Sequence, residues 1–148
     1  MSASRNPAGC NCLALRQAAR QVTRVYDHYL APSGLRATQY SILARLKRDG
    51  PMTVNALADE LLMDRTTLGR NIRPLQRDGL IDAVPGKSDR RSKELRLTRP
   101  GVARVRAARQ NWMRAQARFE RAFGDKRART MRALLRDLTV RVSDAGLA

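Results

Sequence analysis

The fold is most evident in residues 53–97, which read TVNALADELLMDRTTLGRNIRPLQRDGLIDAVPGKSDRRSKELRL. Apolar residues in the first half of this stretch recur at the three- and four-residue spacing of amphipathic helices. Thr53 and Asp64 stand directly before two such runs, and both residue types are favoured helix N-caps. The predicted turn between the two helices, residues 62–64, is as short as a helix-turn-helix requires.

The hydrophobic period changes after this pair of helices. Asp78 and Gly79 end the helical pattern, residues 80–84 precede a Pro-Gly pair, and residues 94–97 alternate as a strand does. This pattern predicts a β-hairpin with a long, charged tip. Two helices joined by a short turn and followed by a hairpin indicate a winged helix-turn-helix.

Helical spacing continues on both sides of this unit. It predicts a helix over about 11–29 and a second that ends at Asp49. Two more helices are predicted after Thr98, which is the N-cap of the first of them, and they are separated at Gly124. The whole chain, 1–148, is therefore predicted to be mainly α, with about six helices and a β-hairpin wing. The winged helix-turn-helix lobe is assigned to residues 38–97.

The flanking helices carry apolar stripes outside this lobe. In the last helix the stripe consists of Met131, Leu135, Leu138 and Val142. Such stripes need a surface to pack against, and a second copy of the chain is the economical answer. We predict that residues 10–30 and 99–145 are dimerisation helices of a homodimer, with an intramolecular bundle as the alternative.

The charge of the chain favours a polyanionic partner. Lys and Arg number 30 against 13 Asp and Glu, a net charge of +17, and most of the excess lies in residues 1–50 and 98–148. Nucleic acid or an acidic membrane surface would suit this balance. No apolar run approaches the roughly 18 residues of a membrane span, and residues 1–9 lack the apolar segment of a secretory signal. We therefore predict a cytoplasmic protein without membrane contact.

Residues suited to catalysis or metal binding are sparse. His28 is the single histidine, which argues against a zinc site and against a His-dependent triad elsewhere. Asp59 and Glu60 are neighbours on a predicted helix and point in different directions, a poor acid–base pair. Residues 86–88, Gly-Lys-Ser, lack the upstream glycine of a phosphate loop. We predict no enzymatic activity, no cofactor and no bound metal.

The second helix of the helix-turn-helix has an outward side suited to DNA. Leu68, Ile72 and Leu75 are predicted to face the core. The polar and basic residues of the opposite side are Arg65, Thr66, Thr67, Arg70, Asn71 and Arg73. In such motifs the second helix enters the major groove, where arginine bonds guanine and asparagine bonds adenine. We predict that this helix reads base edges of double-stranded DNA.

The predicted hairpin tip supplies a second basic group. Its members are Lys87, Arg90, Arg91 and Lys93. A flexible basic loop of this kind inserts arginine into the narrow, electronegative minor groove. Asp89 is an acid among these cations, and we predict that it orients Arg91 through a local hydrogen bond.

The sequence resembles the MarR (multiple antibiotic resistance regulator) family of transcription factors over nearly the whole chain. The motifs that carry the resemblance are TQYSIL at 38–43, LADEL at 57–61, DRTTL at 64–68, LQRDGLI at 75–81, DRRSK at 89–93 and LTRPG at 97–101. The resemblance implies homodimers that bind pseudo-palindromic operators, usually as repressors. It also implies a small-molecule or redox signal felt between the DNA-binding lobe and the dimer interface. The remaining alternative is a basic, architectural protein that binds nucleic acid without sequence preference.

Two cysteines near the N-terminus suggest a redox signal. Some members of the family sense organic hydroperoxides through a cysteine at the start of the first helix, and Cys12 resembles that position, with Cys10 beside it and Tyr26 at the position of a partner tyrosine. Two other tyrosine positions of that pattern are occupied by Arg16 and Ala37. A buried or idle cysteine pair, or a thiolate site for a metal or metalloid, are the alternatives.

Overall fold

The computed structural model describes residues 9–146 and is dominated by helices. Residues 1–8, which make up most of the segment predicted to lack a secretory signal, and residues 147–148 lie outside the described part. The helices are α1 (Asn11–Leu30), α2 (Ala37–Asp49), α3 (Val54–Leu61), α4 (Arg65–Arg77), α5 (Arg99–Phe123) and α6 (Asp125–Asp144), with a short 3-10 turn, η2 (Ala31–Ser33), after α1. The strands are β1 (Met52–Thr53), β2 (Ile81–Pro85) and β3 (Lys93–Leu97). The predicted mainly helical winged helix-turn-helix is confirmed.

The three predicted N-caps each start a helix. Thr53 caps α3, Asp64 caps α4 and Thr98 caps α5. Each side-chain oxygen accepts a hydrogen bond from the backbone amide three residues further on, at 3.1, 2.8 and 3.1 Å respectively. These bonds satisfy backbone donors that the first turn of a helix leaves without partners.

The wing is a three-stranded antiparallel sheet in the order β1-β3-β2. β2 and β3 form the predicted hairpin, with Asp82 opposite Arg96. The sequence did not predict β1, because a strand of two residues is too short to show alternation. It is defined only by pairing, with Met52 opposite Leu95 of β3.

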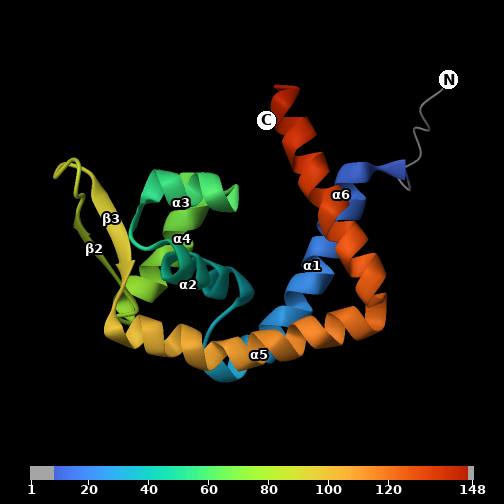
Figure 1. Cartoon of the computed structure of the whole chain (residues 1–148), viewed down its shortest axis with the longest axis horizontal. Coiled ribbons are helices and arrows are strands. Elements are labelled where there is room, and N and C mark those ends of the chain that lie inside the picture. The colour runs from blue at the N-terminus through green and yellow to red at the C-terminus, as the bar shows by residue number, and fades with distance from the viewer. Residues whose placement is uncertain (1–8, 147–148) are drawn as a thin grey trace.

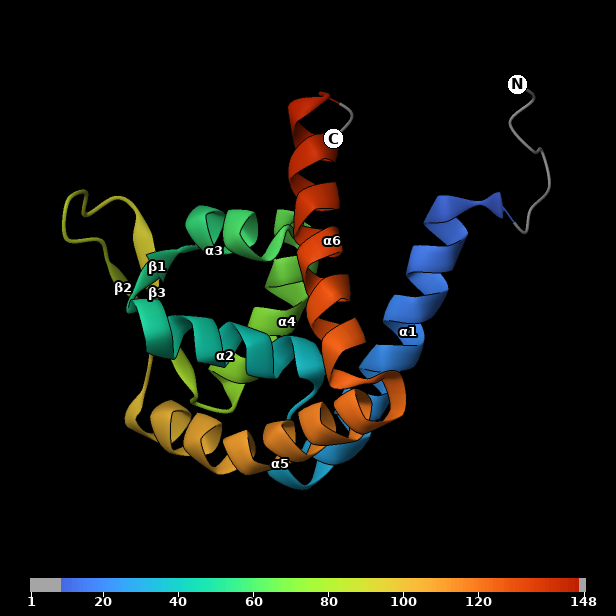
Figure 2. The same cartoon turned by 45° about the vertical axis from the view of Figure 1, so that its right-hand side comes forward.

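The elements form a lobe and two helical arms, and the arms are α1 and α6 (Figure 1). α2, α3, α4 and the sheet gather at one end, while α5 runs along the lower edge and connects this lobe to α1 and α6. Figure 2 shows the N-terminal part of α1 and the C-terminal part of α6 rising from the far end of α5.

The apolar core fills the lobe but also includes the flanking helices. Leu57, Leu68 and Leu43 are completely buried within the lobe. Leu30 of α1 and Ala108 of α5 are equally buried and belong to the same cluster. The core therefore extends beyond residues 38–97, because α5 and the end of α1 cover a side of α2 that would otherwise face water.

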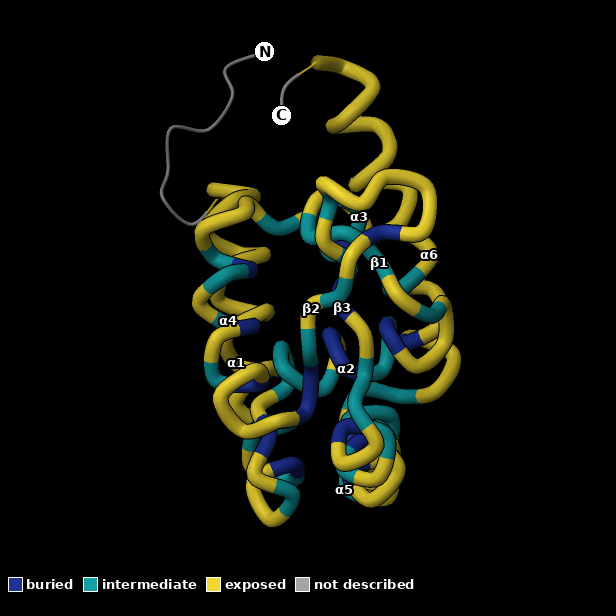
Figure 3. Tube along the Cα trace, turned by 90° about the vertical axis from the view of Figure 1, so that its left-hand side faces the viewer, coloured by how far each residue is buried: buried dark blue, intermediate teal, exposed yellow. Residues whose placement is uncertain are grey.

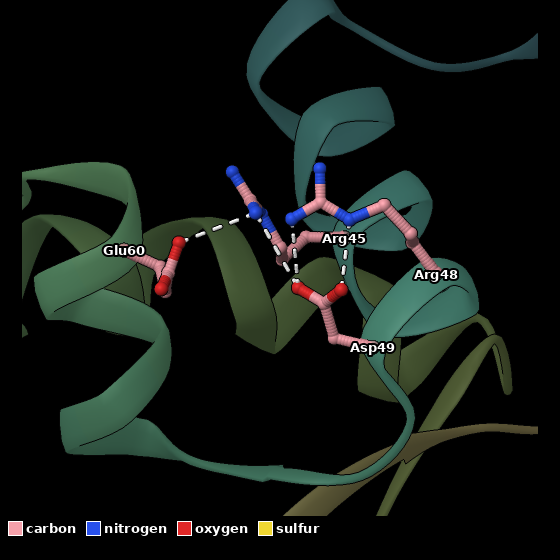
Figure 4. Close-up of polar contacts among 4 residues, drawn as sticks. All are labelled: Arg45, Arg48, Asp49 and Glu60. Carbon is pink, nitrogen blue, oxygen red and sulfur yellow. Dashed lines mark hydrogen bonds and ion pairs between the residues drawn. The ribbon is translucent and has the colours of Figure 1, made fainter.

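A cluster of charged residues joins α2 to α3 (Figure 4). A guanidinium nitrogen of Arg45 lies 3.3 Å from Asp49 on its own helix and 3.2 Å from Glu60 of α3. Arg48 donates two hydrogen bonds to the same Asp49 carboxylate, at 2.7 and 3.0 Å. This cluster fixes α3, the first helix of the helix-turn-helix, against α2.

The arms leave large apolar side chains in solvent. In Figure 3 the upper turns of α6 are exposed throughout, unlike the elements of the lobe. The exposed large apolar residues of the two arms are Leu13, Leu15, Leu134, Leu135, Leu138, Val140 and Val142. Leu135 and Leu138 of the predicted dimerisation stripe are each 40% exposed. A single chain thus does not bury this stripe.

Candidate nucleic-acid interface

The predicted reading helix, α4, separates its buried and exposed sides as expected. Leu68, Ile72 and Leu75 are buried against the lobe. Arg65, Thr66, Arg70 and Arg73 are exposed on the other side. The Asp64 cap accepts two hydrogen bonds from Thr67, from its amide and its hydroxyl, and these bonds hold the pKa of the Asp64 carboxyl below its usual value.

Two of the predicted reading residues make contacts within α4. Thr67 is half-buried, and its hydroxyl donates to Asp64 at 2.7 Å. The Asn71 amide nitrogen donates to the carbonyl of Thr67 at 2.9 Å. This bond uses one of the two amide hydrogens of Asn71, whereas within residues 9–146 the side chain of Arg70 makes no hydrogen bond.

The wing tip is ordered around Asp89. Its carboxylate accepts a hydrogen bond from the backbone amide of Arg91 at 2.9 Å, and its carbonyl accepts one from the hydroxyl of Ser92 at 2.8 Å. The predicted bond between Asp89 and Arg91 is therefore present, but on the backbone and not on the guanidinium. The Arg91 side chain remains exposed, as do Lys87, Arg90 and Lys93.

The base of the wing is braced by an ion pair that the sequence analysis missed. Arg96 of β3 donates two hydrogen bonds to Asp82 of β2, at 2.8 and 3.1 Å. The hydrogen bonds and charge of Arg96 lower the pKa of Asp82, and Asp82 raises that of Arg96. The sequence shows charged and apolar residues alternating in β3 and one acid in β2, but only the register places Asp82 and Arg96 opposite each other.

The cations of α4 and the wing tip are available to an external anion. Within residues 9–146, no ion pair involves any of Arg65, Arg70, Arg73, Lys87, Arg90, Arg91 or Lys93. One rigid helix and one hairpin tip from the same lobe present all seven. This arrangement suits a major groove and an adjacent minor groove.

The two predicted redox cysteines lie at the start of α1, and both are exposed. Cys10 is the N-cap, and its sulfur accepts a hydrogen bond from the amide of Leu13 at 3.4 Å. Cys12 follows in the first turn. Tyr26 lies 14 residues further along α1, about 21 Å from Cys12 at 1.5 Å per residue. The structure of one chain does not bring Tyr26 to Cys12.

Tyr26 instead belongs to a polar chain across three helices. Its hydroxyl donates to Gln116 of α5, and the Gln116 amide donates to Glu120 at 3.1 Å. Arg132 of α6 lies 3.5 Å from the same Glu120 carboxylate. Burial of the ring, and secondarily the charge of Glu120, raise the pKa of Tyr26. These contacts link α1, α5 and α6.

A hollow of about 400 Å³ opens between α2, α3 and α5. Its lining residues are Tyr40, Ser41, Ala44, Arg45, Arg48, Leu61 and Trp112. The rings of Tyr40 and Trp112 stack with centroids 6.2 Å apart. The hollow thus combines aromatic surface with two guanidinium groups, where the lobe meets α5.

Over residues 9–146, no helix is both long enough and apolar enough to cross a membrane. In the same range, no three or more His, Cys, Asp or Glu residues gather where they could hold a metal ion.

The fold and the basic surface define a winged helix-turn-helix protein, and comparison with known proteins identifies its family. The sequence model of the MarR family matches residues 33–92. The chain is 38% identical to the transcriptional regulator MosR of M. tuberculosis, solved in complex with DNA, with a TM-score of 0.75 over 88% of this chain and 96% of that one. The chain belongs to the MarR family of transcriptional regulators.

Curated relatives match a shorter part of the chain. The regulator YwoH of Bacillus subtilis is 32% identical over 85 residues, which are 57% of this chain and 61% of YwoH. The organic hydroperoxide resistance transcriptional regulator of B. subtilis is 28% identical over 91 residues, or 62% of each chain. The chain thus spans about three fifths of the length of these relatives.

Proposed function

We propose that this protein is a homodimeric, sequence-specific DNA-binding regulator that represses transcription from a pseudo-palindromic operator. The observation that carries the proposal is the placement on α4 and the wing tip of seven exposed cations that form no ion pair with any other described residue. Arg70 is the exposed residue best placed to read guanine, and Arg91 would enter the minor groove. The complex of MosR with DNA supports the choice of ligand.

The dimer is proposed from the exposed stripe of α6. Leu135, Leu138 and Val142 are 40%, 40% and 39% exposed in the single chain. Burying apolar surface yields about 25 cal/mol per Å², so a second copy that covers these residues would stabilise the arms. It would also place two reading helices at a fixed distance, as a two-fold symmetric operator requires.

Footprinting on the DNA upstream of the protein's own gene tests operator binding. We expect two protected half-sites whose centres lie about one helical turn, roughly 10 bp, apart. A purely architectural protein would instead give uniform, salt-sensitive protection without preferred positions. Uniform protection at every protein concentration would contradict the proposal.

A small ligand is one proposed signal for release. The hollow between α2, α3 and α5 offers stacked rings and the guanidinium groups of Arg45 and Arg48, which favour an anionic aromatic molecule. Such a ligand would compete with Asp49 and Glu60 for Arg45 and loosen α3 from α2. Trp112 is the only tryptophan, so its fluorescence reports occupancy during titration with a panel of aromatic carboxylates. A ligand that quenches Trp112 fluorescence but leaves operator binding unchanged would show that occupancy of this hollow is not the signal for release.

Thiol oxidation is the second proposed signal. Cys12 lies in the first turn of α1 and is exposed, so a peroxide in solution can reach its sulfur. Attack of the thiolate on an organic hydroperoxide would release the alcohol and form a sulfenic acid. A second thiol, from Cys10 or the partner chain, would then displace water and form a disulfide. The change at α1 would shift the two reading helices relative to each other.

A gel-shift titration with and without organic hydroperoxide tests the thiol signal. We expect peroxide to weaken operator binding by the wild type and thiol reductant to restore it. Cys12→Ser should bind the operator normally and ignore the oxidant. An identical response of wild type and Cys12→Ser would assign the signal to a ligand.

A further inference from the structure

The outward side of α5 carries a row of arginines that operator reading does not use. Arg99, Arg106, Arg114 and Arg121 follow one another at intervals of 7, 8 and 7 residues. At 3.6 residues per turn these intervals place all four within an arc of about 80° on the helix. The row spans 22 residues, or about 33 Å.

The arginines of the row have no structural partners. All four are exposed, and within the described residues none forms an ion pair or a side-chain hydrogen bond. Arg104, on the inner side of α5, contrasts with them, because it donates to the carbonyl of Ser33 at 3.2 Å. The row is therefore not needed to hold the fold together.

The surface around the row lacks negative charge. The positions between its members are mostly uncharged, including Ala103, Gln110 and Ala117. The one carboxylate of α5, Glu120, is directed to Gln116 and Arg132. An ordinary solvated helix face intersperses acids with bases to form pairs four residues apart, and this face does not.

The row faces away from the reading surface. α2 contacts both α4 and α5, and Figure 3 shows α4 at the left edge of the lobe and α5 at its lower right. The solvent sides of α4 and α5 therefore point in different directions, with α5 along the lower edge of the lobe (Figure 2). A duplex bound by α4 and the wing would leave the row free.

We propose that the row of Arg99, Arg106, Arg114 and Arg121 binds the phosphate backbone of a second DNA duplex without sequence preference, so that one protein holds two duplexes together. Double-stranded DNA carries a charge every ~1.7 Å of its axis, and one helical turn is about 34 Å long, close to the length of the row. An exposed guanidinium can pair with a phosphate through two parallel hydrogen bonds. An acidic protein would need carboxylates matched to the two-turn spacing, whereas a duplex meets the row in any register.

A capture assay with two duplexes tests this surface independently of operator reading. A biotinylated random-sequence duplex of about 30 bp, roughly three helical turns, is immobilised and loaded with protein. A fluorescent duplex of a different random sequence is then added. The test variant is Arg106→Gln/Arg114→Gln. The matched control, Arg129→Gln/Arg136→Gln, removes the same charge from two exposed arginines two turns apart on α6.

We expect the wild type and the control to retain the second duplex. The test variant should retain roughly tenfold less at equal salt, because two phosphate contacts per chain are lost, while its binding to the immobilised duplex changes little. Undiminished capture by the test variant, an equal loss in the control, or no capture by the wild type at low salt would overturn the proposal. Retention of labelled polyglutamate in place of the duplex would also overturn it and indicate an acidic protein partner. Operator footprinting does not depend on the row, so this proposal can fail while the proposed operator binding stands.

Discussion

The DNA-reading lobe buries its leucines, whereas the two arms leave many of theirs exposed to solvent. In the lobe, Leu57 and Leu68 have no exposed surface and belong to the common apolar core. In α6, Leu134 is 65% and Leu138 40% exposed. Both regions have helical apolar periodicity, but only the lobe has elements that cover its stripes. Helical periodicity therefore predicts a helix with an apolar side, but it does not say which molecule covers that side.

The largest expected effect is the loss of assembly on placing a charge in the α6 stripe. Leu135→Glu would put a carboxylate into an apolar interface, which is costly without a partner charge. We expect monomers by light scattering and no operator binding, because one half-site loses the linked second contact. Ala133→Glu is the control, since it adds the same charge on the opposite side of α6. A Leu135→Glu protein that remained dimeric would place the interface elsewhere.

The next effect concerns the buried core that the lobe shares with α5 and the end of α1. Leu68→Ala removes a fully buried side chain and should lower the free energy of unfolding by about 2–5 kcal/mol, measured by urea denaturation. Leu134→Ala removes the same atoms from a side chain that is 65% exposed, so its effect should be much smaller. Equal losses would mean that the arms and the lobe do not differ as the exposed fractions indicate.

A smaller effect is expected at the reading surface. Arg70→Ala should weaken binding to the cognate operator by about 1–3 kcal/mol, because a bidentate contact to a base is lost. On random DNA the loss should be much smaller, since only one charge is removed. The two affinities are compared by gel shift at one salt concentration. Equal losses on both DNAs would reassign Arg70 to backbone contact.

The smallest effect is a pH dependence of stability from the wing brace. Arg96 lowers the pKa of Asp82 in the folded protein, so the bond stabilises the fold above the unfolded pKa, near 3.9. This contribution is lost as the pH falls through the lower, folded value. The urea midpoint of Asp82→Asn should lie below that of the wild type at pH 7, and the two should converge below about pH 4. Asp59→Asn, at an exposed carboxylate outside any ion pair of the described residues, should show no such convergence.

Much of the fold depends on local chemistry and not on tertiary contacts. Thr53, Asp64 and Thr98 each cap the predicted helix, because a side-chain oxygen satisfies the amides of the next turn regardless of distant residues. The hairpin and the exposed side of α4 follow from periodicity in the same way. The MarR family, too, was indicated by short motifs and is confirmed by comparison.

The turn between α3 and α4 has a backbone conformation that its local sequence does not predict. Leu62 adopts the left-handed conformation, with φ of 51°, and is 72% exposed. Glycine or asparagine normally marks such a position, and neither is present. The packing of α3 and α4 on the lobe imposes this conformation on a residue whose type does not favour it.

The helices, their caps, the wing and the basic residues of the reading surface are predictable from sequence, because they depend on neighbours within one or two turns. Which side chains meet across elements depends on the tertiary structure. It paired Asp82 with Arg96, joined Arg45 to Glu60, and directed Tyr26 to Gln116 and not to Cys12. These contacts depend on strand register and helix packing, which arise from burying the common core and leave no local periodic signal.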